Sequence, residues 1–204
     1  MSFAASLASQ LAHPDGMAGR LLGHAMDFVN RRPTRLAIDA LAPRAGEHIL
    51  DVGCGTGAAL DALLRRADVR ATGIDPSRVM AAMAAERLDG RALVLRTRIE
   101  TMPFGAEMFD GVMLLNILYF CDTRARQLAR VRETLRPGGR AVAYVTHRDS
   151  MTRWAFTREG HHRLYDEREL RELFVAAGFA SAGTSVQAVP VTRSIKGLVA
   201  IATR

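Results

Sequence analysis

Three glycines between two apolar segments constrain the fold of this chain more than any other feature. The segment ILDVGCGTGAAL, residues 49–60, passes from a hydrophobic run through glycines at 53, 55 and 57 into a helical pattern. Glycine at such positions lets the backbone turn tightly and lets a ligand approach with no Cβ in the way. The free N–H groups at the start of the next helix face the same space. We therefore predict a strand, a ligand-binding loop and a helix, in that order.

The rest of the chain alternates short apolar runs with longer amphipathic stretches. This alternation is typical of βαβ units, so we predict an α/β fold with a mostly parallel sheet and helices on both faces. The expected strands are the seven runs 48–52, 69–74, 92–96, 111–115, 140–146, 185–189 and 198–202. The expected helices are 58–66, one capped by Ser77 that runs to 87, one from Asp122 to Leu135 that Pro137-Gly138-Gly139 ends, and one from Asp166 to Ala177.

The 204 residues contain no repeat and no flexible linker, which predicts a single domain. Two amphipathic stretches, 17–30 and 34–41, precede the first strand, and Pro33 separates them. We expect residues 1–45 to form an N-terminal helical cap on a core of residues 46–204. The irregular polar segment 147–165 is a candidate lid, because open α/β sheets bind ligands at the carboxyl ends of their strands, where the strand order reverses.

The composition is that of an ordinary globular protein, with 49% apolar and 24% charged residues. It excludes a disordered chain and a disulfide scaffold, and no apolar run approaches the roughly 18 residues of a membrane-spanning helix. The net charge of +7 fits either a solvated basic surface or anionic partners. The first residues make a poor secretory signal, and Cys54 and Cys121 have no metal-ligating neighbours in the sequence. We therefore expect reduced cysteines, no metal and a cytoplasmic location.

Two acidic residues narrow the choice of ligand. The glycines also fit the dinucleotide pattern G-x-G-x-x-A, but Asp51 stands two positions before the first of them and would repel a pyrophosphate. The ammonium and sulfonium of S-adenosylmethionine would instead be attracted. Asp75 ends the next strand, where a carboxylate can accept bonds from both ribose hydroxyls. This second residue fits NAD(P) equally well, so it is Asp51 that favours S-adenosylmethionine over NAD(P). The succession of strand, loop, helix, strand and acidic residue argues against a purely structural turn.

From about residue 36 to residue 179 the chain resembles the class I S-adenosylmethionine-dependent methyltransferases. LDVGCGTG resembles their first motif, GIDPS the second and ETMPF the segment beside the adenine. FDGVMLLNILYF resembles their fourth strand with the loop after it, and LRPGGRAVAY the turn into the fifth. The resemblance implies a seven-stranded Rossmann-like sheet and transfer of a methyl group. It names no substrate.

The resemblance also implies a set of cofactor-binding residues. Around the methionine portion these are Asp51, Gly53, Cys54 and Gly55; along the ribose and adenine, Asp75, Pro76, Met80, Ile99 and Glu100; and near the sulfonium, Asn116 and Ile117. One position departs from the family, which often has an acidic residue for the adenine amino group where this chain has Arg98. Arginine has no acceptor atom, so the adenine contacts are less well defined than the ribose contacts.

The acceptor side is expected after the fourth and fifth strands. His147 directly follows the fifth strand and Tyr119 the fourth, so we predict these two as catalytic residues, His147 as a general base. In the lid segment, His161, His162, Trp154, Phe156 and Tyr165 are residues that could stack on a substrate. On the cap, Arg20, Arg31, Arg32 and Arg35 form a basic set. The tetrapeptide N-I-L-Y after the fourth strand argues against methylation of a nucleobase or a glutamine amide.

These observations favour a methyltransferase that acts on O or N of a small molecule, anionic or aromatic in character. One alternative is a phospholipid-headgroup or other lipid N-methyltransferase, since the basic, amphipathic start could touch a membrane. Another is a non-catalytic S-adenosylmethionine-binding module or an RNA-binding relative. Nucleic acid is not the expected partner, because an aromatic content of 6% offers little stacking surface. The oligomeric state is left open.

Overall fold

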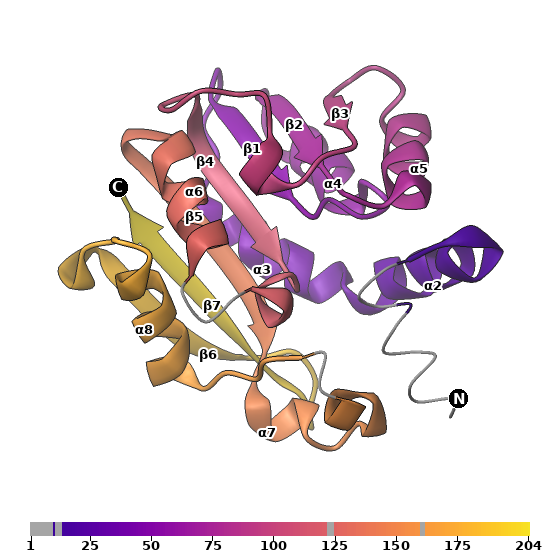
Figure 1. Cartoon of the computed structure of the whole chain (residues 1–204), viewed down its shortest axis with the longest axis vertical. Coiled ribbons are helices and arrows are strands. Elements are labelled where there is room, and N and C mark those ends of the chain that lie inside the picture. The colour runs from indigo at the N-terminus through magenta and orange to yellow at the C-terminus, as the bar shows by residue number, and fades with distance from the viewer. Residues whose placement is uncertain (1–9, 11–13, 122–124, 160–161) are drawn as a thin grey trace.

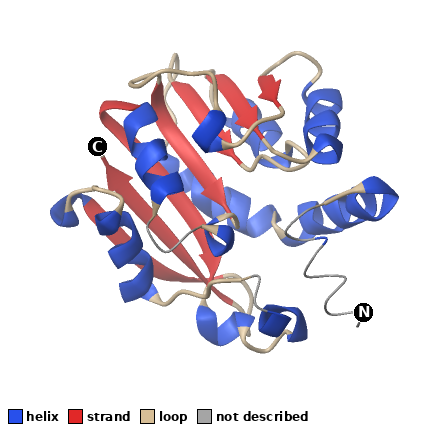
Figure 2. Cartoon of the chain, viewed as in Figure 1, coloured by secondary structure: helices blue, strands red, loops and turns tan. Residues whose placement is uncertain are grey.

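The computed structural model describes residue 10 and residues 14–121, 125–159 and 162–204. One seven-stranded sheet runs through it, with helices in front and behind (Figures 1 and 2). The strands are β1 (His48–Val52), β2 (Arg70–Ile74), β3 (Leu93–Leu95), β4 (Phe109–Leu115), β5 (Leu135–Thr146), β6 (Thr184–Pro190) and β7 (Lys196–Thr203). The α-helices are α2 (Gly16–Val29), α3 (Arg31–Leu41), α4 (Ala58–Arg66), α5 (Arg78–Leu88), α6 (Arg126–Thr134), α7 (Arg148–Met151) and α8 (Glu167–Ala176). Short 3-10 turns are η1 (Ile99–Thr101), η2 (Leu118–Phe120), η3 (Ala155–Glu159) and η4 (Ser181–Gly183).

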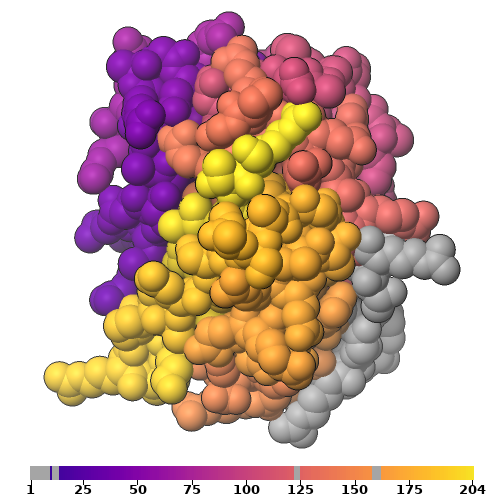
Figure 3. Space-filling view, turned by 90° about the vertical axis from the view of Figure 1, so that its left-hand side faces the viewer, coloured from indigo at the N-terminus to yellow at the C-terminus, as the bar shows by residue number. Residues whose placement is uncertain are grey.

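The strand order is β3-β2-β1-β4-β5-β7-β6, and the first five strands are parallel. Strand β7 pairs antiparallel with both β5 and β6, which confirms a mostly parallel α/β sheet. The order reverses between β1 and β4, so their carboxyl ends, at Val52 and Leu115, open a crevice where such sheets bind ligands. Figure 3 shows the molecule from the side of the β6 edge of the sheet, where the yellow and orange segments of β6, β7 and α8 face the viewer.

Alternate residues of the central strands feed two separate apolar cores. Leu50 of β1 belongs to the core under α6 and α8, whereas its neighbour Ile49 belongs to the core under α3, α4 and α5. Strand β5 alternates in the same way, with Val142 and Tyr144 on the second side. This alternation follows from the two-residue repeat of a strand, and it explains why strands buried on both faces read as continuous apolar runs.

The expected start of the fifth strand is wrong. Residues 135–139 were expected to end the helix before the fifth strand, but they begin β5: Leu135 pairs with Phe109, and the N–H of Gly138 donates to the carbonyl of Arg204. Long-range pairing therefore takes over a segment whose local signal is a helix stop. The expected N-cap of that helix, Asp122, lies outside the described residues.

Pro33 does not separate the two cap helices. The break falls at Asn30, and Pro33 lies in the first turn of α3. N–H groups in the first turn of a helix have no intrahelical partner, so a proline there costs no hydrogen bond. Among the described residues, no helix is long and apolar enough to cross a membrane.

Candidate functional site

A cleft of about 960 Å³ opens at the carboxyl ends of β1, β2 and β4. Its floor is the glycine loop between β1 and α4. One wall is the cap helix α2, and the opposite wall is the loop after β4 with part of the segment after β5. Of the expected cofactor-binding residues, all eleven line it: Asp51, Gly53, Cys54, Gly55, Asp75, Pro76, Met80, Ile99, Glu100, Asn116 and Ile117.

The glycine loop is held against the end of β2. The N–H groups of Gly53 and Cys54 both donate to the carbonyl of Ile74, at 2.8 and 3.0 Å. Gly53 has a φ of +71°, and a Cβ there would overlap the side chain of Ile117. Gly55 has a φ of +53°, but a Cβ there would meet no protein atom within 4 Å. Gly53 is thus required by packing, whereas Gly55 leaves open space above the loop.

The two acidic residues of the cleft differ in their partners. Asp75 accepts the N–H of Gly55 at 3.0 Å and the N–H of Ser77 at 2.8 Å. Asp51 is 1% exposed, and neither of its carboxylate oxygens has a hydrogen-bond partner. Buried polar groups are nearly always paired, so a ligand in the cleft is expected to place a hydrogen-bond donor or a cation beside the Asp51 carboxyl group.

The same contrast governs how the two carboxyls ionise. Burial raises the pKa of Asp51 to about 8, and the nearby charge of Asp75 adds to the increase. Burial also raises the pKa of Asp75, while its two backbone hydrogen bonds act in the opposite direction. A ligand with a positive charge beside Asp51 would favour the ionised form of this carboxyl. The residues present therefore fit a cationic ligand such as S-adenosylmethionine.

A chain of polar contacts connects the loop after β4 to its neighbours. The Tyr119 hydroxyl donates to Asn116 Oδ1 at 3.1 Å and accepts the N–H of Thr146, at the end of β5, at 2.5 Å. Asn116 Nδ2 donates to Asn30 Oδ1, between the cap helices, at 3.0 Å. Burial raises the pKa of Tyr119 well above its usual range. With its oxygen both donating and accepting, Tyr119 holds Asn116 in place and is poorly suited to take a proton.

A second set of contacts fastens the cap helix α2 to the glycine loop. The Thr56 hydroxyl donates to Asp27 Oδ1 at 2.5 Å and accepts from Arg87 Nη1 at 2.6 Å. Arg87 Nη2 closes the triangle on Asp27 Oδ2 at 2.7 Å. We call Asp27, Thr56 and Arg87 the cap clamp. It joins α2, the loop and α5 beside the cofactor-binding end of the cleft.

The far end of the cleft carries a group of rings that we call the aromatic cluster: Tyr119, Phe120, Trp154, Phe156 and His162. The His162 ring lies 5.1 Å from Phe120, 5.4 Å from Phe156 and 5.9 Å from Tyr119, measured between centroids. Trp154 stacks on Phe156 at 5.7 Å. Three of these residues come from the expected lid segment. Of its other candidates, Tyr165 is fully buried in the core, and His161 lies outside the described residues.

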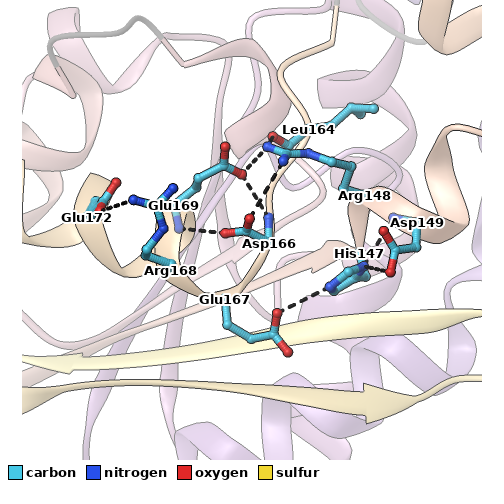
Figure 4. A network of polar contacts seen from close by, with 9 residues as sticks. All are labelled: His147, Arg148, Asp149, Leu164, Asp166, Glu167, Arg168, Glu169 and Glu172. Carbon is cyan, nitrogen blue, oxygen red and sulfur yellow. Dashed lines mark hydrogen bonds and ion pairs between the residues drawn. The ribbon is translucent and has the colours of Figure 1, made fainter.

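The structure does not bring His147 to this cleft. Figure 4 shows its side chain between those of Asp149 and Glu167. Its Nδ1 accepts the N–H of Asp149, where His147 caps the short helix α7, and its Nε2 lies 3.2 Å from the Glu167 carboxylate. Because Nδ1 is an acceptor, Nε2 carries the proton, and both nitrogens are engaged. The backbone turns into α7 directly after β5, which takes the ring toward α8 and away from the cavity.

The basic set on the cap also lies outside the cleft. Arg31 rests over the Phe28 ring at 4.9 Å, and Arg20 is within 3.8 Å of Glu86. Arg32 and Arg35 are exposed, and none of the four lines the cavity. Within the described ranges, no three His, Cys, Asp or Glu side chains are grouped as metal ligands would be.

Comparison with known proteins identifies the family of this chain. A family model described as a methyltransferase domain matches residues 50–143. An uncharacterized methyltransferase of Geobacillus kaustophilus is 30% identical over 160 residues, which cover 71% of this chain and 74% of the relative. The chain belongs to the class I S-adenosylmethionine-dependent methyltransferases. It is therefore an enzyme of that type, and NAD(P) and a purely structural glycine turn are set aside.

Two further comparisons add detail on this methyltransferase. The O-methyltransferase cnsE of Penicillium expansum is 33% identical over 121 residues, which cover 57% of this chain and 44% of cnsE. A Burkholderia thailandensis 1,6-didemethyltoxoflavin-N1-methyltransferase has the same fold, with a TM-score of 0.73, 24% identity, and coverage of 99% of this chain and 88% of that one. The match to cnsE and two other fungal O-methyltransferases spans only 44–53% of their lengths.

Sequence reasoning predicted an N-terminal cap but did not single out the two cap residues that contact the loops of the site. Asp27 and Asn30 stand three positions apart at the end of α2, so that one helix turn reaches both loops of the site. The only signal in the sequence is that two short polar side chains follow an otherwise apolar stretch. Nothing local identifies their partners, Thr56 and Asn116, which lie 29 and 86 residues away.

Proposed function

We propose that this methyltransferase transfers the methyl group of S-adenosylmethionine to an oxygen or nitrogen of a small, planar aromatic molecule. The observation that carries the proposal is the aromatic cluster, which faces the same cleft as the unpartnered Asp51. Aromatic rings pair well at centroid separations of about 4.5–7 Å, the spacing already present within the cluster. A flat acceptor would therefore be held by ring faces and edges, with few polar contacts.

The cofactor end of the cleft would hold S-adenosylmethionine through this chain's acidic residues. Asp51 would pair with the ammonium of the methionine portion, and Asp75 has remaining lone pairs for the ribose hydroxyls. Pro76, Met80, Ile99 and Glu100 would border the adenine, and Asn116 and Ile117 the sulfonium. When bound, the cofactor supplies a methyl group on a good leaving group.

Catalysis would rest chiefly on alignment. Holding acceptor and methyl donor in line can supply roughly 7–11 kcal/mol of the barrier. The Asn30–Asn116–Tyr119 contacts would keep the loop between the two ends of the cleft in one conformation. The aromatic cluster would keep water from the reacting atoms.

For an acceptor that arrives with a proton, we propose His162 as the general base in place of His147. His162 is the histidine that lines the cleft within the described part of the chain. Imidazole suits this task because it accepts a proton near neutral pH. His147 already uses both of its nitrogens outside the cleft.

The proposed acceptor class is tested by a labelled-methyl transfer screen. Phenols, catechols and aromatic amines are compared with aliphatic alcohols, aliphatic amines and phospholipid vesicles, and products are identified by mass. We expect transfer to aromatic compounds, with the Trp154→Ala, Phe156→Ala double variant raising their KM about tenfold or more while the S-adenosylmethionine Kd is unchanged. Equal turnover of aliphatic analogues, or labelled lipid, would overturn the aromatic assignment.

The proposed base is tested with a matched pair of variants, His162→Gln and His147→Gln. Loss of a general base lowers kcat by about 10²-fold or more. We expect that loss for His162→Gln only, with cofactor affinity kept. A fall in kcat confined to His147→Gln would identify His147 as the catalytic histidine. An unchanged kcat in both variants would overturn the proposed base and indicate that the acceptor reacts without one.

A further inference from the structure

The outward face of helix α2 is apolar and exposed. Met17, Leu21, Phe28 and Val29 are 80%, 70%, 69% and 58% exposed, and they are half of the eight large hydrophobic side chains exposed in the described structure. Ala18 and Ala25 are exposed as well. At 100° per residue these six positions cover a continuous arc of roughly 120° on one side of the helix. Exposed apolar residues on a protein surface are ordinarily scattered singly, whereas these six form one continuous strip.

The inward face of α2 is already used by the protein. Gly23 packs against Thr56 and Met80, and Leu22 and Met26 line the cleft. Arg20, His24 and Asp27 are the only ionisable residues among its fourteen. A helix that is apolar nearly all round is normally buried on all sides. Here one side packs on the body while the other faces outward, and α2 projects from the sheet (Figure 1).

Positive charge borders the exposed arc. Arg20 flanks it along the helix, and Arg31, Arg32 and Arg35 follow at its C-terminal end, all four exposed. Arg31 lies over the Phe28 ring, and within the described residues no acidic side chain pairs with Arg31, Arg32 or Arg35. An apolar helix face edged by arginines is the pattern of helices that lie in the interface of an anionic membrane.

We propose that the outward face of α2 docks this protein on an anionic lipid surface. The net charge of +7 adds long-range attraction to such a surface. A second copy of the chain fits less well, because an isologous contact would bring the same arginines of two protomers together. Val29 belongs both to the exposed arc and to the lining of the cleft, so a docked membrane would lie at the edge of the cavity.

The test measures co-sedimentation with sucrose-loaded vesicles of phosphatidylcholine alone or with 30% phosphatidylglycerol. We expect binding to the anionic vesicles that falls steeply between about 0.1 and 0.5 M salt, where screening shortens the Debye length from about 10 Å to a few ångströms. The Leu21→Gln, Phe28→Gln variant should bind at least about tenfold more weakly. The Arg31→Gln, Arg32→Gln, Arg35→Gln variant should lose about 100-fold on anionic vesicles.

The matched control is Leu93→Gln with Val175→Gln, two other exposed apolar residues, which should bind like the wild type. Circular dichroism melts show whether each variant is folded. Absence of vesicle binding by the wild type, or equal loss in the control, would overturn the proposal. So would a concentration-dependent dimer in light scattering that the α2 variant abolishes, because a second copy would then be the occupant.

Discussion

At the scale of single residues, Asp51 is the buried acid of the cleft that has no hydrogen-bond partner. Its carboxyl is buried without a partner, and its pKa is raised to about 8. At pH 7 it is therefore mostly protonated in the free protein. A cation placed beside it lowers its pKa, because an opposite charge favours the ionised form. Binding of a cationic ligand must then release the proton.

We predict that S-adenosylmethionine binding at pH 7 releases about one proton per site. Calorimetric titrations in two buffers of different ionisation enthalpy measure it directly. Affinity should also rise as the pH increases from 6 to 8, since less work is then needed to ionise Asp51. Asp51→Asn should bind more weakly and release no proton. Identical binding enthalpies in both buffers would show that Asp51 does not change its ionisation.

The two glycines at 53 and 55 should respond differently to the same substitution. Gly53→Ala places a Cβ against Ile117, so it should destabilise the fold, whereas Gly55→Ala carries only the strain of a positive φ, about 1–2 kcal/mol. We expect Gly55→Ala, and more so Gly55→Val, to weaken S-adenosylmethionine binding in a protein that still melts cooperatively. Melting curves and titrations on the pair measure both effects. Normal affinity in folded Gly55→Val would mean that the ligand does not approach this backbone.

At the scale of secondary-structure elements, the cap clamp decides where α2 sits. Asp27 and Arg87 are about one-quarter exposed, and they share Thr56 between them. Hydrogen bonds to charged groups contribute about 1.5–3 kcal/mol each when they are partly shielded from water. The cap helix should therefore detach from the glycine loop when one member is removed.

We predict that Arg87→Met lowers S-adenosylmethionine affinity about tenfold and speeds tryptic cleavage after Arg20 in α2. Arg65→Met is the matched control, because Arg65 forms an exposed pair with Asp61 away from the cleft. It should change neither quantity. Equal effects of the two variants would assign the result to general charge loss instead of the clamp.

At the scale of the whole molecule, β7 is the element that joins the C-terminal hairpin to the parallel sheet. Gly197 of β7 lies directly against the Tyr144 ring of β5, and a Cβ at this position would enter that ring. Tyr144 is one of the largest fully buried side chains, so it has no space to move.

Gly197→Ala should therefore destabilise the protein by about 1–3 kcal/mol, the usual cost of overpacking. Gly105→Ala is the control, because a Cβ there meets no atom within 4 Å. Denaturant unfolding of both variants measures the difference. If Gly197→Ala were as stable as the control, the β5–β7 contact would be looser than the structure has it.

Local sequence patterns were enough to predict most of the strands and the glycine loop. His48–Val52 and Ala58–Arg66 agree with the structure at both ends, because hydrophobic periodicity and capping act between near neighbours. The segment 135–139 was mispredicted because its conformation depends on Phe109 and on the last residue of the chain. A helix stop and the start of a strand look alike until the partner strand is known.

In the candidate site too, some residues were located by sequence motifs, whereas the placement of other side chains was decided by the tertiary structure. The expected cofactor-binding residues were positioned by the resemblance of their motifs to those of the methyltransferases, and all of them line the cleft. His147 and Tyr119 were placed by the same reasoning, yet their rings lie where the tertiary structure puts them: one against Glu167, the other between Asn116 and Thr146. The side chain just after a strand can point to either side, and only the turn that follows and the elements packed around it select one. The cap clamp depends on contacts between residues 29 to 60 positions apart, which no local pattern encodes.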